Sequence, residues 1–199
     1  VQIGSMSIMS ILSNTTNVIA EGEVQQLVNA RDPEVSEENY LTVIHKKTAV
    51  LFEAAAQCAC VLAEAPANTQ EQARLYGYHI GVAFQLVDDI LDYSGDAEAM
   101  GKNVGDDLAE GKATLPLIYT MKHGDSAASS LIRSAILESK SDALNDIISA
   151  VQNSGGIEYT KNLAQAHAAK AKATLATFEP SPFRDALEEL ADFAVQRTF

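Results

Sequence analysis

Hydrophobic residues recur at intervals of three and four along most of this 199-residue chain, the spacing that gathers side chains on one face of an α-helix. Glycine, proline and polar clusters separate the periodic stretches. The pattern predicts helices over residues 3–30 (one helix or two), 36–63, 69–93, 115–122, 126–138, 142–153, 157–178 and 182–198. Because runs of β-branched and aromatic residues are few, and the length suffices for one sizeable core, we expect a single all-α domain.

The first periodic stretch carries an apolar stripe at Ile3, Met6, Met9 and Leu12 and becomes polar over residues 20–27. An apolar stripe on a helix packs against other apolar surface. We therefore expect these four side chains to need a partner surface. Because the sequence begins with valine, in a pattern typical of mid-domain helix, we also expect it to be a fragment of a longer protein.

A lysine lies on the apolar stripe of the second stretch, which begins at Ser36, a favourable N-cap residue type. That stripe comprises Tyr40, Ile44, Leu51, Ala55 and Cys58. Lys47 falls on the same face. A lysine on the core-facing side of a helix either extends its ammonium group to water or meets an anion. The spacing alone leaves both outcomes open.

Acidic residues interrupt the apolar helix predicted over residues 69–93. Gln85, Asp88 and Asp92 are spaced i, i+3 and i+7, and Asp89 is adjacent, so the four polar groups share one side of the helix. The remaining positions from 81 to 92 are mostly apolar, which indicates that this polar side faces a cavity. Buried carboxylates need a counter-charge, and oxygen ligands with no Cys or His nearby suit magnesium. The alternative is an acidic helix end exposed to solvent.

A loop containing glycine and lysine follows at residues 101–116. Its three glycines permit close approach of the backbone to a ligand, and Lys102 and Lys112 bring positive charge beside the acids. This composition suits a phosphate group, although the spacing of a P-loop is missing. The alternative is an ordinary solvated turn.

Composition restricts the possible partners. The chain holds 14 Lys and Arg against 27 Asp and Glu, a formal net charge of −13, so we expect no binding to nucleic acid or to anionic lipid. Cys58 and Cys60 lack the spacing of a zinc site, and we interpret both as reduced core thiols. Because neither a run of 18 apolar residues nor a signal peptide occurs, we expect a cytoplasmic protein that is not integral to a membrane.

Four ordered motifs together resemble the trans-prenyltransferases, the polyprenyl diphosphate synthases. They are the polar segment 20–27, the pair Lys47-Thr48, the string Phe84-Gln85-x-x-Asp88-Asp89-x-x-Asp92, and the glycine- and lysine-containing loop 101–112. The likeness covers residues 17–117 and is strongest to the bacterial octaprenyl diphosphate synthases. It implies an isoprenoid (terpenoid) synthase-like helical bundle, here missing its N-terminal helices, with residues 1–199 as the C-terminal part of a single polyprenyl synthase domain.

The resemblance also implies a reaction, in which Mg²⁺ assists head-to-tail addition of isopentenyl diphosphate to an allylic prenyl diphosphate, giving octaprenyl diphosphate for a quinone side chain. The implied catalytic residues are Lys47, Thr48, Gln85 and Asp88. The implied ligands of the allylic diphosphate are Lys47, Thr48, Gln85, Lys102 and Lys112. The implied metal ligands are Asp88, Asp89 and Asp92, and the implied assembly is a homodimer.

This sequence departs from the family in one respect. The family carries two facing aspartate-rich motifs, whereas the only further acidic string of this kind here is Asp106-Asp107-x-x-Glu110, which belongs to the loop. We therefore expect the chain alone to be inactive as a prenyltransferase. Two alternatives are a non-catalytic subunit of a heteromeric prenyl synthase, which intact Lys47 and Gln85 disfavour, and a terpene cyclase-like enzyme, whose second motif differs from DDxxD. A helical scaffold without a small-molecule site leaves Lys47 unexplained.

Overall fold

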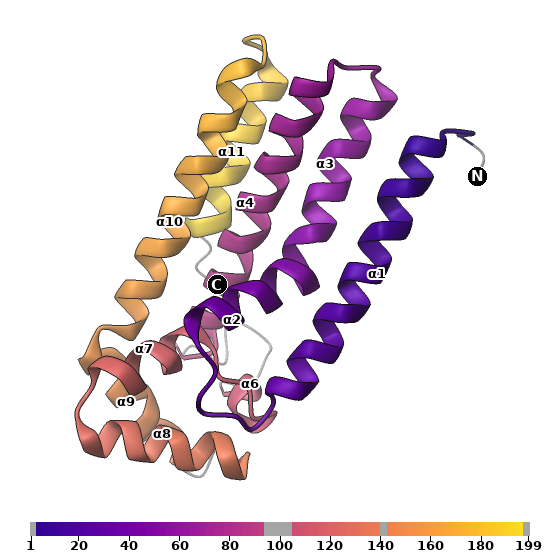
Figure 1. Ribbon diagram of the computed structural model, residues 1–199. Helices are drawn as coiled ribbons and strands as arrows, with labels where there is room; N and C mark the ends of the chain where they lie inside the picture. The colour runs from indigo at the N-terminus through magenta and orange to yellow at the C-terminus, as the bar shows by residue number, and fades with distance from the viewer. Residues whose placement is uncertain (1–2, 94–104, 140–142, 197–199) are drawn as a thin grey trace.

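The computed structural model describes residues 3–93, 105–139 and 143–196 (Figure 1). In order, its helices are α1 (Met6–Asn29), α2 (Glu37–Ile44), the π-helix η1 (His45–Ala49), α3 (Val50–Leu62), α4 (Ala67–Leu91), α6 (Asp106–Ala109), α7 (Leu115–His123), α8 (Ser126–Glu138), α9 (Leu144–Ser154), α10 (Gly156–Thr174), the 3₁₀-helix η2 (Leu175–Thr177) and α11 (Pro182–Gln196). No strand occurs in these ranges, which confirms the all-α expectation.

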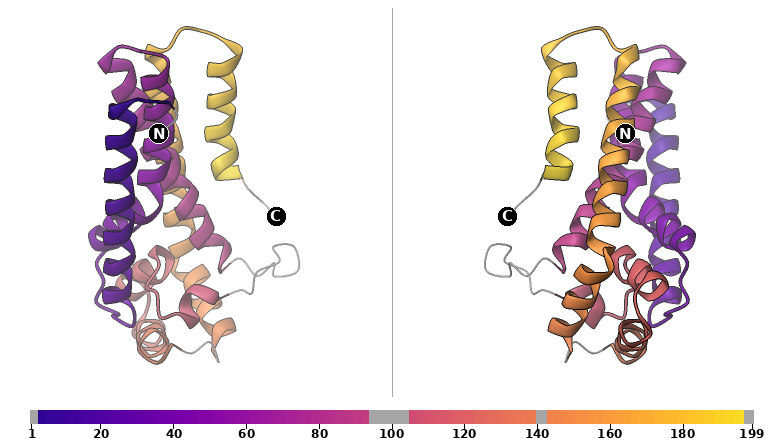
Figure 2. Two further views of the ribbon diagram at one scale, coloured as in Figure 1. Left: turned by 90° about the vertical axis from the view of Figure 1, so that its right-hand side faces the viewer. Right: turned by 90° about the vertical axis from the view of Figure 1, so that its left-hand side faces the viewer.

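The long helices form a row, with α10, α4, α3 and α1 side by side (Figure 1). Helix α11 lies behind this row, where it packs against α10 and α4 (Figure 2). Helices α6 to α9 gather at one end of the row, next to the C-terminal end of α4 and the N-terminal end of α10 (Figure 1). The acidic end of α4 therefore lies between the row and this group of shorter helices.

Glycines set the close packing of α3 against α4. A Cβ atom on Gly77 would lie 2.3 Å from the carbonyl oxygen of Phe52, and one on Gly81 would lie 2.5 Å from the Cα of Ala49. Backbone atoms leave no room at such distances, so these positions require glycine. The contact holds η1 and the acidic half of α4 at a fixed separation.

Because of the π-helical turn, the buried face of residues 36–63 differs from the apolar stripe expected from the sequence. Five residues in i→i+5 geometry rotate the following helix relative to an unbroken α-helix. Beyond η1 the buried face is therefore formed by Val50, Glu53 and Ala54, whereas Leu51 is 54% exposed. The expected continuation of the stripe through Leu51 and Ala55 was wrong, because sequence spacing assumes a constant 3.6 residues per turn.

The two cysteines are free thiols, as expected, but only partly buried. Cys58 and Cys60 lie on α3 after the π-helical turn, at positions of intermediate exposure, so their assignment to the core was wrong. Partial burial raises the pKa of both thiols above the usual value. Neither cysteine therefore has the depressed pKa of a reactive thiol.

The core has two parts, both of which include α4. The larger surrounds Leu86 at the acidic end of α4 and includes Leu115 and Leu117 of α7. The smaller joins Tyr76 and Ile80 of α4 to α10, η2 and α11. Because α4 contributes to both parts, its buried side is fixed along most of its length.

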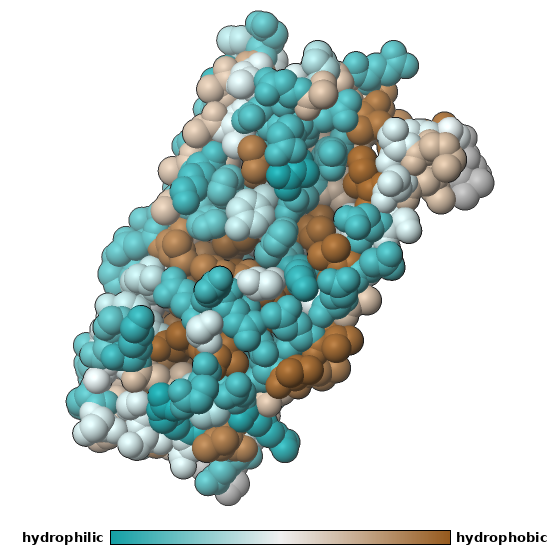
Figure 3. All heavy atoms as spheres, viewed as in Figure 1, coloured by the Kyte–Doolittle hydropathy of each residue, from teal (hydrophilic) through white to brown (hydrophobic). Residues whose placement is uncertain are grey.

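Helix α1 packs on the row through only a few side chains and leaves much apolar surface exposed. Its buried residues are Ile8, Thr15 and Gly22, spaced seven apart. Its exposed large hydrophobic residues are Met6, Met9, Leu12, Val24, Leu27 and Val28. Figure 3 shows hydrophobic residues gathered over the lower part of this helix. Among the described helices, none is both long and apolar enough to cross a membrane.

Candidate active site

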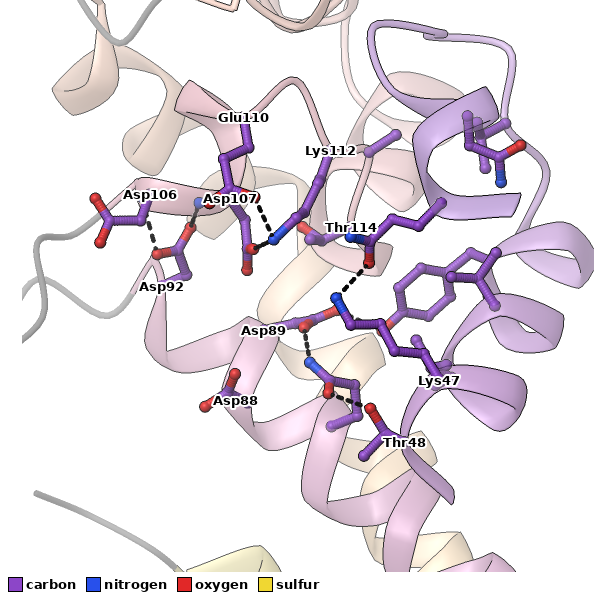
Figure 4. Close-up of a pocket in the computed structure, with 18 of the residues that line it drawn as sticks. Lys47, Thr48, Asp88, Asp89, Asp92, Asp106, Asp107, Glu110, Lys112 and Thr114 are labelled. Carbon is purple, nitrogen blue, oxygen red and sulfur yellow. Dashed lines mark hydrogen bonds and ion pairs between the residues drawn. The ribbon is translucent and has the colours of Figure 1, made fainter. Parts of the chain in front are cut away.

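A cavity of about 690 Å³ opens where α1, α2 and η1 meet the C-terminal half of α4 and the segment 106–114. This volume is in the range of small-molecule sites. Its walls include Gln26, Tyr40, Lys47, Thr48, Gln85, Asp88, Asp89, Asp92, Asp107, Glu110 and Lys112. Figure 4 shows the labelled lysines and acids around one space, contributed by η1, α4 and the 106–114 segment.

Lys47 reaches the cavity from the π-helical turn η1. Its ammonium nitrogen donates a hydrogen bond to Oε1 of Gln26 (3.1 Å) and forms an ion pair with Oε1 of Glu23 (3.4 Å), both on α1. Its side chain is about one-third exposed, at 32%. Lys47 is therefore neither fully solvated nor part of the core. It lines the cavity. π-helical turns occur frequently at functional sites, since they redirect a side chain without ending the helix.

A chain of hydrogen bonds links η1 to Asp89 of α4. The hydroxyl of Thr48 donates to Oε1 of Gln85 (3.0 Å), and the amide nitrogen of Gln85 donates to Oδ1 of Asp89 (2.8 Å). The hydroxyl of Tyr40 donates to Oδ2 of Asp89 (2.5 Å). Both oxygens of Asp89 therefore accept side-chain hydrogen bonds. The bonds that Gln85 makes with Thr48 and Asp89 fix the orientation of its amide.

Asp89 and Asp88 differ in their surroundings. Asp89 is only 2% exposed, and burial together with the negative charge of Asp107 raises its pKa to about 7. Asp88 is half-buried and lies on the cavity wall. The difference follows from their positions on α4, because adjacent residues point about 100° apart around the helix axis. Asp89 is turned toward Tyr40 on α2, whereas Asp88 is more exposed to the cavity.

Asp92 fixes the start of the segment that carries Lys112. Its Oδ1 accepts hydrogen bonds from the backbone N–H groups of Gly105 (3.1 Å) and Asp106 (3.2 Å), and its Oδ2 accepts one from Asp107 (3.3 Å). Burial and the charge of Asp107 nevertheless raise the pKa of Asp92 to about 6. Gly105 has φ +84°, a left-handed conformation that favours glycine.

Lys112 is held by acids of its own segment. Its ammonium nitrogen lies 2.6 Å from Oδ1 of Asp107 and 2.8 Å from Oε2 of Glu110. Burial alone lowers the pKa of Lys112, but the hydrogen bonds to Asp107 and Glu110 outweigh it and raise that pKa above the usual value. Gly111, at φ +75°, makes the turn that returns Lys112 toward these acids.

The structure brings together most of the site residues expected from the sequence. Around one cavity lie Lys47, Thr48, Gln85, Asp88, Asp89, Asp92 and Lys112. Lys102 lies outside the described residues. Sequence reasoning assigned Tyr40 only to the apolar stripe and did not identify its contact with Asp89. A buried tyrosine hydroxyl needs a hydrogen-bond partner, and that requirement was the available signal.

The donor set can be tested against a divalent cation. Within the described ranges, no group of three or more His, Cys, Asp or Glu residues is arranged to hold a metal ion. Magnesium is usually bound through one or two carboxylates together with phosphates of a substrate, so a closed protein cage is not required. The acids facing the cavity offer hard oxygen atoms, and both oxygens of Asp89 already accept protein hydrogen bonds. The chemistry of these residues fits a cation that shares its coordination with a phosphate ligand.

Comparisons with known proteins agree with this geometry. Residues 1–153 match the Polyprenyl synthetase family. The chain is 47% identical over 196 residues to octaprenyl diphosphate synthase of Escherichia coli (strain K12), covering 98% of this chain and 61% of that protein. It is 45% identical over 199 residues to octaprenyl diphosphate synthase of Haemophilus influenzae, covering 100% of this chain and 60% of that protein.

Solved structures give the same result for the fold. The crystal structure of a polyprenyl synthase from Caulobacter crescentus CB15, complexed with calcium and isoprenyl diphosphate, superposes with a TM-score of 0.94 at 43% identity, covering 98% of this chain and 60% of that chain. A decaprenyl diphosphate synthase from Rhodobacter capsulatus gives a TM-score of 0.91 at 36% identity, covering 98% and 61%. The chain thus spans about 60% of the length of these relatives. The expected isoprenoid synthase-like fold is confirmed, and the chain belongs to the polyprenyl synthetase family.

Proposed function

We propose that residues 1–199 are the C-terminal part of a single polyprenyl synthase domain that adds isopentenyl diphosphate units to an allylic prenyl diphosphate. The observation that carries this proposal is the cavity in which Lys47 and Lys112 face the acids of α4. Two lysine ammonium groups on the same cavity wall as Asp88 and Asp92 suit a ligand with several negative charges. Such a ligand can share a divalent metal ion with a carboxylate. The family and the identity to octaprenyl diphosphate synthases support the same reaction.

Diphosphate departure needs positive charge at the leaving oxygens. Mg²⁺, held by Asp88 with Asp89 and Asp92 in support, would supply much of that charge when bound. Lys47 and Lys112 bind the diphosphate oxygens from two sides of the cavity. We assign Lys102 to the same diphosphate by its place in the motif; it lies outside the described residues.

Thr48 and Gln85 orient the reacting end of the allylic substrate. The amide nitrogen of Gln85 donates to Asp89, and its carbonyl oxygen accepts from Thr48, so the side chain keeps one orientation in the cavity. An amide and a hydroxyl present dipoles to a developing allylic cation without forming a covalent bond to it. Val43 and Ile44 on the cavity wall exclude water, which otherwise captures the cation.

Further properties of the whole protein are part of the proposal. Identities of 45–47% favour octaprenyl diphosphate as product, destined for a ubiquinone-type quinone side chain. The apolar surface left exposed on α1 supports a homodimer. We place the enzyme in the cytoplasm. We propose that this 199-residue chain alone is inactive, because it spans about 60% of the length of its relatives.

The alternatives are less well supported. A non-catalytic subunit of a heteromeric synthase has no need of the diphosphate lysines and oriented Gln85 that line this cavity. A terpene cyclase-like enzyme is disfavoured by relatives that are octaprenyl diphosphate synthases.

Calorimetric titration of the 199-residue chain with inorganic pyrophosphate tests the site directly. We expect magnesium-dependent binding that Lys47→Met weakens about tenfold or more, since a charge-assisted contact to a diphosphate is lost. Lys46→Met, which removes the neighbouring lysine of η1, is the matched control and should bind as the unaltered chain does. Binding without magnesium dependence, or equal affinity after Lys47→Met, contradicts the proposal. Farnesyl diphosphate and isopentenyl diphosphate should give no elongated product with this chain, and an elongated product disproves its inactivity.

A further inference from the structure

Helix α1 touches the π-helical turn η1 at a glycine. A Cβ atom on Gly22 would lie 2.8 Å from the backbone nitrogen of Lys47 and 2.8 Å from the Cβ of Lys46. Real Cβ atoms do not approach backbone this closely, so a larger residue would push α1 away from η1. Gly22 is buried in this contact. The polar end of α1 is therefore placed directly over the two lysines of the turn.

The residues on either side of Gly22 pair with different lysines. Glu21 forms an ion pair with Lys46 (Oε2 to Nζ, 3.3 Å). Glu23 forms one with Lys47 (Oε1 to Nζ, 3.4 Å), and Gln26, one turn further along α1, accepts a hydrogen bond from the same ammonium group (3.1 Å). The cavity wall includes Lys47 and Gln26 but neither Lys46 nor Glu21. Only the second set of contacts therefore acts on a residue of the site.

These contacts pull the ammonium group of Lys47 toward α1. An incoming diphosphate must compete with the carboxylate of Glu23 for that group, because an ammonium nitrogen shared between two anions is bound less strongly by each. Gln26 holds the ammonium with a neutral carbonyl and offers no opposing charge. Glu23 is about half exposed, at 48%, so the competition is of the moderate size of exposed ion pairs.

We propose that Glu23 and Gln26 are positioning residues for Lys47, and that Glu23 lowers the affinity of the site for diphosphate by competing for the ammonium group. The inference rests on the proposed function, since it assumes that Lys47 binds the diphosphate. In this arrangement α1 determines how readily the ammonium group of Lys47 exchanges its contacts with Glu23 and Gln26 for contacts with the ligand. The weaker hold on diphosphate that this competition causes favours release of the pyrophosphate product after each addition.

Isosteric exchanges of charge test the inference by titration of the 199-residue chain with inorganic pyrophosphate in the presence of magnesium. Glu23→Gln removes the competing charge and should tighten binding about two- to fivefold, the size of an exposed ion pair. Gln26→Glu adds a competing charge and should weaken binding by a similar factor. The double variant Glu23→Gln/Gln26→Glu should return close to the affinity of the unaltered chain.

Two controls separate this mechanism from a general effect of charge. Glu21→Gln removes the same charge from the same helix, next to Lys46, and should leave the pyrophosphate affinity unchanged. In a Lys47→Met background, the effects of Glu23→Gln and Gln26→Glu should disappear, because the two changes act through Lys47.

The outcomes that contradict the inference are distinct from failure of the proposed function. Unchanged affinity in Glu23→Gln and Gln26→Glu, or changes of equal size in the Lys47→Met background or in Glu21→Gln, overturns the positioning role while the diphosphate site stands. Absence of magnesium-dependent pyrophosphate binding in the unaltered chain, or binding insensitive to Lys47→Met, overturns the proposed function and the inference with it.

Discussion

Lys47 and Lys112 reach the same cavity from different elements, and their surroundings differ. Lys112 is 2.6 Å from Asp107 and 2.8 Å from Glu110, both on its own segment. Lys47 contacts the neutral amide of Gln26 at 3.1 Å and the half-exposed Glu23 at 3.4 Å. Short contacts to two carboxylates neutralise a lysine, whereas longer contacts to one leave it available to a ligand. The comparison indicates that Lys112 contributes more to the stability of its acidic segment than Lys47 does to that of η1, and that Lys47 is the more available of the two lysines.

The largest expected effect concerns turnover in the full-length enzyme. On the proposed function, Lys47→Ala or Asp88→Ala should lower turnover about 10²- to 10³-fold, because each would remove stabilisation of charge that develops as diphosphate leaves. Folding should survive, with the thermal midpoint of the ligand-free Lys47→Ala protein within about 2 °C of the parent. Steady-state kinetics and thermal melting check both. Near-normal turnover combined with a lowered ligand-free midpoint would end the catalytic assignment.

The next effect is on stability and should separate the two lysines. Lys112→Met leaves Asp107 without its ion-pair partner in a partly buried position, and we expect a loss of about 2 kcal/mol in the free energy of unfolding. The matched change Lys47→Met should cost about 0.5 kcal/mol or less, since its ion pair is more exposed. Urea unfolding of both variants measures the difference. Equal losses in the two variants would remove the distinction drawn above.

The smallest expected effect is a pH dependence of stability at the contact between α4 and α10, outside the cavity. His167 of α10 lies with its Nδ1 3.2 Å from the Nδ1 of His79 on α4. Burial, followed by the proximity of His79 and Lys170, lowers the pKa of His167 to about 4. A histidine whose pKa is lowered by folding stays neutral in the folded state, while the unfolded chain binds protons below its pKa of about 6.5. Its contribution to stability is therefore complete above pH 7 and is lost as the pH falls toward 4.

Substitution of His167 tests this dependence. Between pH 7 and pH 5 the unaltered chain should lose about 1–2 kcal/mol more unfolding free energy than His167→Gln, as measured by urea unfolding at each pH. His123→Gln, which removes an exposed histidine from the end of α7, is the control and should lose as much as the unaltered chain. A His167→Gln protein that loses stability as steeply as the control contradicts the assignment of this pH dependence to the α4–α10 contact.

The sequence was sufficient for most of the fold. Helical periodicity placed every long helix, because each has a buried and an exposed face that recur with its turns. It also placed Asp88, Asp89 and Asp92 beside a cavity, because a polar side on an otherwise apolar helix needs such a space. The different burial of Asp88 and Asp89 was not predicted, since it depends on Tyr40 of α2, which lies 49 residues before Asp89 along the chain.

Two other features depend on tertiary contacts that spacing does not record. The π-helical turn at residues 45–49 changes the face that α3 buries. This turn packs against Gly22 of α1, a contact that the spacing within one helix does not reveal. Glu23 and Gln26 belong to the polar segment 20–27, for which the family resemblance gave no individual residue a role, and only the structure shows that both reach Lys47. A polar residue at a helix end is usually solvated. The spacing of hydrophobic residues therefore cannot show that such a residue contacts a lysine on another helix.

The π-helical turn also implies a conflict between two demands on one short segment. A regular helix from residue 37 to residue 62 would have better backbone hydrogen bonds, yet η1 contains one residue more than such a helix accommodates. If these same residues wound as a regular α-helix, α2 would turn relative to α3 by about 100°, one residue's share of a helical turn. Tyr40 would then lose Asp89, and the cavity would lose a wall. The chain thus keeps a π-helical turn at η1, where a regular α-helix would direct Lys47 away from the cavity.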